Sequence, residues 1–97
     1  MADNGDGWWS FIKLLQQAKT TAELDKLLLL LLTAEERLAL AKRCQIIEAL
    51  LKGDRPQRAI AQELQVSISK ITRGSNELKQ TSEELKHFLQ QQLLADK

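Results

Sequence analysis

Cysteine is nearly absent from this chain of 97 residues, in which Cys44 is the only one. A single cysteine excludes an intramolecular disulfide and a cysteine-based zinc cluster, and it is typical of a reducing, cytoplasmic setting. A chain this short has a small core and commonly needs a disulfide, a metal or a partner subunit for stability. We therefore expect one small domain that gains stability by oligomerisation.

Long apolar runs are missing as well. No apolar segment reaches the roughly 18 residues that a membrane-spanning helix requires. Residues 1–7 include Asp3 and Asp6, where a secretory signal peptide would carry lysine or arginine. The sequence therefore predicts a cytoplasmic protein that is neither exported nor embedded in a membrane.

Signals for β-strands are scarce, because the chain has no tyrosine, few β-branched residues and no sustained alternation of polar and apolar positions. Leucine, alanine, glutamine, glutamate and lysine are abundant and favour helix. We predict an all-α fold with about six helices and a flexible N-terminal tail over residues 1–7. The helices are expected to begin near residues 8, 21, 33, 56, 67 and 82.

Three helix starts carry a threonine with a glutamate three positions later. In such a capping box, each side chain accepts a hydrogen bond from the backbone N–H of the other residue. The three pairs are Thr20/Glu23, Thr33/Glu36 and Thr81/Glu84. Ser67 is expected to cap the helix that follows it.

Two helices carry large apolar surfaces. Six consecutive leucines, residues 27–32, coat the whole circumference of the second helix. Such a helix is either buried in a core or packed from both sides by two subunits, and both interpretations stay open. The long third helix presents a face with Leu40, Cys44, Ile47 and Leu51, in which Cys44 is expected to be a small core residue.

The net charge of +1 is unevenly distributed along the chain. Residues 55–79 hold five basic and two acidic side chains, a local charge of +3. Residues 1–32, 33–54 and 80–97 carry −1, 0 and −1. A local positive excess of this kind is the footprint of a phosphate-binding surface.

Two short helices joined by a tight turn lie in this basic segment, which is the signature of a helix-turn-helix DNA-binding unit. Ala61 is small where the two helices must cross. The expected shared core consists of Ile60, Leu64, Val66, Ile68 and Ile71. The polar side chains that would reach base edges and phosphates are Ser67, Ser69, Lys70 and Thr72. A helical hairpin with a solvated basic face is the alternative interpretation.

A distinctive run lies on the second helix of this unit: Ile71-Thr72-Arg73-Gly74-Ser75-Asn76. It is accompanied by Leu32-Thr33, Glu36-Arg37, Arg43, Gln57-Arg58 with Ile60, and Leu78-Lys79. With these motifs, residues 33–79 resemble the tryptophan repressor family. The similarity extends more weakly through the leucine-rich helix and the last helix, so that only the N-terminal tail lies outside it.

The resemblance implies an intertwined all-helical homodimer. Such a dimer binds free L-tryptophan as corepressor and then represses operators of tryptophan biosynthesis and transport genes. This function is not enzymatic and needs no metal or other cofactor. Residues 8–97 would form a single domain, with residues 8–54 and 80–97 as the dimerisation core and residues 55–79 as the reading head that binds double-stranded operator DNA.

The resemblance also implies a tryptophan site between subunits. Arg43 and Arg73 match the two arginines that stack above and below the indole ring from different subunits, where cation–π attraction is favourable. Thr33 and the backbone carbonyls of Leu30 and Leu32 would receive polar groups of the ligand. The slot itself would be lined by Ile46, Ile47 and Gly74.

Glu77 departs from the family pattern, because better-known members carry a serine there that helps to bind the ammonium group of the ligand. A carboxylate would pair with that ammonium more strongly, or it would repel the ligand carboxylate and change the preferred ligand. We favour the first interpretation because an α-amino group needs an acceptor.

For DNA, the resemblance implies that Arg58 reaches a guanine edge. The positions matched to phosphate or base contacts are Gln57, Ile68, Ser69, Lys70 and Thr72. Two alternative functions stay open. The first is a helix-turn-helix protein with a different effector or none, and a ligand-independent protein of this kind would not need Arg43 opposite Arg73. The second is a helical protein-interaction dimer, which would bind DNA weakly without sequence preference.

Overall fold

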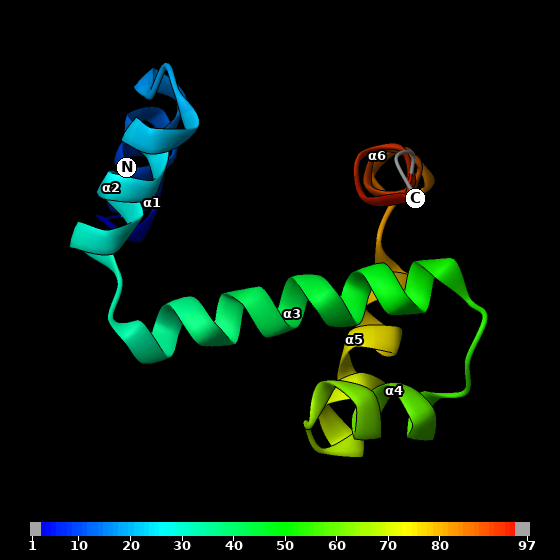
Figure 1. Cartoon of the computed structure of the whole chain (residues 1–97). Coiled ribbons are helices and arrows are strands. Elements are labelled where there is room, and N and C mark those ends of the chain that lie inside the picture. Colours follow the sequence, from blue (N-terminus) through cyan, green and yellow to red (C-terminus); the bar gives the residue numbers. More distant parts are fainter. Residues whose placement is uncertain (1–2, 95–97) are drawn as a thin grey trace. The chain divides into compact units, whose positions relative to one another are not determined.

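The computed structural model describes residues 3–94, and these residues form six α-helices without a strand (Figure 1). The predicted all-α fold with about six helices is confirmed. None of the helices in this range is long and apolar enough to cross a membrane. The helices are α1 (Asp3–Gln17), α2 (Thr21–Leu31), α3 (Ala34–Lys52), α4 (Gln57–Leu64), α5 (Ile68–Gln80) and α6 (Glu83–Leu94).

The start of α1 differs from the prediction. Residues 3–7 were expected in the flexible tail, and they are helical. Met1 and Ala2, the rest of that predicted tail, lie outside the described residues. Extending an existing helix costs far less than nucleating one, and an acidic residue such as Asp6 near the N-terminus is favoured by the helix dipole. These effects outweigh the low helix propensity of Gly7.

One of the predicted capping boxes, Thr33/Glu36, is confirmed in full, and Thr20/Glu23 is confirmed only in the cap by Thr20. The N–H of Glu23 donates to Thr20 Oγ1 at 3.1 Å, although the carboxylate of Glu23 turns to the N–H of Lys19 at 2.7 Å. In the second box the exchange is reciprocal. The N–H of Glu36 donates to Thr33 Oγ1 at 3.0 Å, and the N–H of Thr33 donates to Glu36 Oε1 at 2.8 Å.

The third box, Thr81/Glu84, is wrong by one residue. Ser82 caps α6, because its Oγ accepts the N–H of Leu85 at 3.1 Å. The hydroxyl of Thr81 instead donates to the backbone carbonyl of Glu77 at 2.9 Å and so belongs to the end of α5. Adjacent threonine and serine both suit an N-cap. Because Thr81 is bonded to the last turn of α5, Ser82 is the residue that caps α6.

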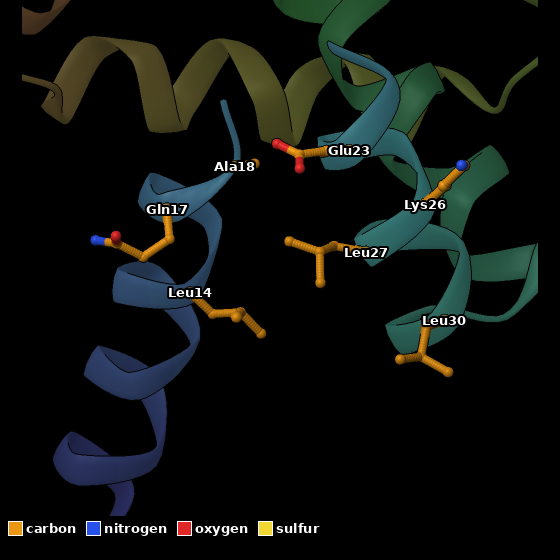
Figure 2. A pocket seen from close by; sticks show the side chains of 7 residues that line it. All are labelled: Leu14, Gln17, Ala18, Glu23, Lys26, Leu27 and Leu30. Atoms are coloured by element: carbon orange, nitrogen blue, oxygen red, sulfur yellow. The ribbon is translucent and has the colours of Figure 1, made fainter. Parts of the chain in front are cut away.

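The chain forms two compact units, Met1–Leu38 and Ala39–Lys97. In the first unit, α1 and α2 border an open hollow of about 430 Å³, and Figure 2 shows Leu14 and Leu27 pointing toward one another across it. Within the described chain no residue of the leucine-rich α2 is buried, and Leu30 is 81% exposed. Within a single chain, α2 is therefore not a buried core helix.

The core of the second unit joins three helices. Ile46 and Ala49 of α3 pack with Ile60 and Ala61 of α4 and with Ile71 of α5. Leu50, Leu64 and Val66 pack against this cluster. The predicted helix-turn-helix core is thus confirmed at its two helices and at its turn.

Ile68 is the exception to that core, because it is 49% exposed. It is the first residue of α5, and the helix reaches the core one turn later at Ile71. The predicted face of α3 is also incorrect in part. Cys44 is exposed and not in the core, because α4 and α5 cover the neighbouring face with Ile46 and Ala49 instead.

Candidate functional site

The helix-turn-helix unit consists of α4 and α5, which contact one another directly (Figure 1). Ile60 and Ile71 are almost completely buried between them. The turn closes with two hydrogen bonds, from the N–H of Gln65 to the carbonyl of Gln62 and from the N–H of Val66 to the carbonyl of Ala61. This pair is the Schellman pattern that ends many helices, and it places Gln65 in the left-handed region at φ 57°.

The side chains predicted to contact DNA lie on the exposed part of this unit. Gln57 is half-buried, and the exposed members of the set are Arg58, Ser67, Ile68, Ser69, Lys70 and Thr72. Ser67 occupies the N-cap position of α5, but its hydroxyl lies 3.0 Å from that of Ser69 and caps no backbone N–H. The two hydroxyls therefore lie together at the start of α5, one on its N-cap residue and one in its first turn.

The charges of the segment are unevenly paired. The guanidinium of Arg55 forms ion pairs with Asp54, just before α4, and with Glu63 near the end of α4. The positive charge of Arg55 is therefore neutralised within the unit. Four further cations are exposed and form no ion pair within the described residues: Arg58, Lys70, Arg73 and Lys79. The remaining positive charge is thus available to phosphate groups.

The predicted ligand residues of the second unit lie on α3 and α5. Gly74 faces α3 closely, because a Cβ atom at Gly74 would lie 3.1 Å from Ile46 Cγ2 and 3.4 Å from Leu50 Cδ1. Gly74 therefore permits the close approach of α5 to α3 and brings Ile46 beside it. Ile47 is half-buried, and the charged members Arg43, Arg73 and Glu77 are exposed.

The predicted ligand residues of the first unit lie around the end of α2. The hydroxyl of Thr33 accepts the N–H of Glu36 and keeps its own O–H as a donor. The carbonyl of Leu32 accepts a hydrogen bond from Arg37 Nη1 at 3.1 Å and retains a second lone pair. Leu30 is exposed.

Sequence reasoning missed two side chains that organise these elements. Arg37 fixes the carbonyl of Leu32, and nothing in its local sequence signals this contact. Lys42 donates to the backbone carbonyl of Leu64 at the end of α4. Lys42 lies one turn before Ile46 on the buried face of α3, which the structure and not the sequence identifies.

Comparison with known proteins agrees with this architecture. The sequence model of the family described as Trp repressor protein matches residues 6–93. A Trp operon repressor homolog from Photobacterium profundum is 45% identical over 82 residues, which are 84% of this chain and 80% of that protein.

Two further relatives carry the same description, Trp operon repressor homolog. The protein of Vibrio cholerae serotype O1 is 45% identical over 87 residues, 90% of this chain and 84% of its own length. The protein of Chlamydia trachomatis serovar L2 is 42% identical over 87 residues, 90% of this chain and 93% of its own length. With the family model covering nearly the whole chain, this protein belongs to the Trp repressor protein family.

Proposed function

We propose that the protein is a transcriptional repressor that binds L-tryptophan as corepressor and then binds operator DNA of tryptophan biosynthesis and transport genes. The observation that carries this proposal is the α4–α5 unit, in which a buried core supports an exposed helix start and four cations without ion pairs among the described residues. Family membership supports the same function.

The DNA-binding part follows from the chemistry of the unit. The start of α5 presents Ser69 and Lys70, whose short or flexible polar groups suit base edges and phosphates in a major groove. Arg58 on α4 would reach a guanine edge with its bidentate guanidinium. The exposed apolar side chain of Ile68 is available for contact with a thymine methyl group.

A homodimer is supported by the apolar surface that a single chain leaves uncovered. In the described residues no side chain of α2 or α6 is buried, and Leu30 and Phe88 are 81% and 54% exposed. Leu40 is exposed on the face of α3 that turns away from the core of the second unit. Large apolar side chains left exposed on several helices of one chain are typical of subunit interfaces.

The tryptophan site would form between the two subunits of that dimer. The exposed guanidinium groups of Arg43 and Arg73 would stack on the two faces of the indole ring. The free O–H of Thr33 would donate to the ligand carboxylate, and the carboxylate of Glu77 would accept the ligand ammonium.

Coupling between ligand and DNA would arise as a shift in populations. Tryptophan held against Arg73 would favour the orientation of α5 that fits the major groove. Tryptophan tightens DNA binding only to the extent that it binds this orientation of α5 more tightly than the other orientations.

The experiment is titration calorimetry of the purified protein with L-tryptophan, compared with indole-3-propionate and other amino acids. We expect saturable binding at one ligand per chain. Operator binding, measured with and without tryptophan, should be lost in Arg58→Ala while the ligand still binds. Absence of tryptophan binding would favour a different effector or none, and an Arg58→Ala variant that binds DNA as the wild type does would favour a protein-interaction dimer.

A further inference from the structure

One hydrogen bond ties the turn of the helix-turn-helix unit to the long helix. The ammonium of Lys42 on α3 donates to the backbone carbonyl oxygen of Leu64, the last residue of α4, at 2.6 Å. The two residues are 22 positions apart in the chain, and the bond is partly buried. A short bond from an ionised donor is stronger than a neutral one.

The position of Lys42 explains why its ammonium reaches this carbonyl. Lys42 precedes Ile46 and Ala49 on the buried face of α3, at the spacing of successive helical turns. Its aliphatic stem can therefore follow the apolar contact between α3 and α4 while the charged end extends beyond it. Carbonyl groups at a helix C-terminus lack helical partners and carry partial negative charge, which favours a cation there.

The bond from Lys42 adds a third hydrogen bond to the carbonyl groups at the end of α4. The two turn bonds engage the carbonyls of Ala61 and Gln62. Lys42 engages the carbonyl of Leu64, directly before Gln65. Gln65 adopts a left-handed backbone conformation, which residues other than glycine rarely adopt. Lys42 thus holds the backbone of the turn against α3 next to Gln65, the turn residue with the least favourable backbone conformation.

We propose that Lys42 is a positioning residue of the helix-turn-helix unit. Lys42 fixes the α4–α5 turn to α3 and thereby sets the orientation of the start of α5. This inference rests on the proposed DNA-binding function. Lys42 acts through Leu64 and Gln65, and phosphate binding is left to the exposed cations Arg58 and Lys70.

The test compares the full-length protein with Lys42→Met, which keeps the length of the stem and removes the donor. Lys42→Arg keeps a cationic donor. Lys52→Met is the matched control, because it removes a lysine from the same helix whose only ion pair among the described residues, with Asp54 at 3.7 Å, is exposed to solvent. Two quantities are measured: amide hydrogen exchange at Gln65 and Val66, and affinity for operator and random DNA over a range of salt concentrations.

In Lys42→Met we expect exchange at Gln65 and Val66 to accelerate about tenfold or more, and operator affinity to fall about tenfold, the effect of losing one charge-assisted hydrogen bond. Affinity for random DNA and the salt dependence of operator binding should stay as in the wild type. Lys42→Arg should restore slow exchange and operator affinity, and Lys52→Met should behave as the wild type does.

The proposal is overturned if Lys42→Met reduces the slope of log affinity against log salt by about 0.9 for each lost contact, because Lys42 would then bind phosphate itself. It is also overturned if exchange and operator affinity both stay unchanged. If Lys42→Met does not fold, Lys42→Leu, which also lacks a donor, replaces it with the same expected results. A wild type that binds no operator would refute the proposed function, whereas hydrogen exchange would still decide whether Lys42 holds the turn.

Discussion

The hydroxyl of Thr72 donates a hydrogen bond to the side-chain carbonyl of Gln57 at 3.2 Å. This bond joins the first residue of α4 to the second turn of α5, at the opposite end of α4 from the turn. Both residues are predicted DNA contacts. With its oxygen engaged by Thr72, the amide of Gln57 has its two N–H donors free for phosphate oxygens.

Replacing Thr72 by valine should therefore weaken operator binding by releasing Gln57. Valine keeps the shape of threonine and removes the donor, so that the loss should be about 0.5–1.5 kcal/mol. A double-mutant cycle with Gln57→Ala measures the coupling directly by operator titration. Additive losses in the two single variants would show that the bond between them does not contribute, and Thr21→Val on α2 serves as the control.

Gln65 occupies the left-handed position of the turn, where glycine has no steric cost. We expect Gln65→Gly to raise the free energy of unfolding by roughly 0.5–1 kcal/mol, because relief of the left-handed strain exceeds the entropy that glycine loses on folding. Urea denaturation at fixed protein concentration measures the change.

Gln45→Gly provides the matched control for that variant, since Gln45 is exposed in the middle of α3. Glycine in a helix interior should lower the free energy of unfolding by roughly 0.5–1 kcal/mol. If Gln65→Gly destabilises the protein as Gln45→Gly does, the turn does not hold Gln65 in the left-handed region in solution.

The helices and the core of the helix-turn-helix unit were predictable because their sequence signals are local. Apolar residues at helical spacing identified Ile60 and Ile71, and threonine–glutamate pairs located the starts of α2 and α3. The local signal failed where two neighbouring residues compete for one role, as Thr81 and Ser82 do at the start of α6.

Other features depend on how helices pack, and sequence spacing does not determine them. The apolar residues of α3 surround much of the helix, so that only the tertiary structure shows that Ile46 and Ala49 face the core and Cys44 does not. The contact of Lys42 with the carbonyl of Leu64 likewise depends on the crossing of α3 and α4. The candidate ligand residues were identified by family resemblance, and their joint action stays a prediction.

Glu77 should determine how the ligand's amino group is recognised. If its carboxylate pairs with the ammonium, Glu77→Gln should weaken L-tryptophan binding roughly tenfold, as expected for loss of a charge-assisted hydrogen bond. Binding of indole-3-propionate, which lacks the ammonium, should stay the same or improve. Calorimetry with both ligands makes the comparison, and tighter binding of both ligands by Glu77→Gln would instead indicate that Glu77 repels the ligand carboxylate.

Reciprocity gives the strictest check on the coupling between the two sites. If L-tryptophan tightens operator binding by some factor, operator DNA must tighten tryptophan binding by the same factor, because both describe one coupling free energy. Tryptophan titrations with and without saturating operator measure the second factor, and an equal ligand affinity in both would contradict the proposed mechanism.

Arg73→Ala should remove the ligand response, because Arg73 lies on α5 beside Gly74, where that helix meets α3. A variant that loses Arg73 and still responds to tryptophan normally would place the ligand elsewhere, whereas one that binds operator equally weakly with and without tryptophan would support Arg73 as the link between ligand and DNA.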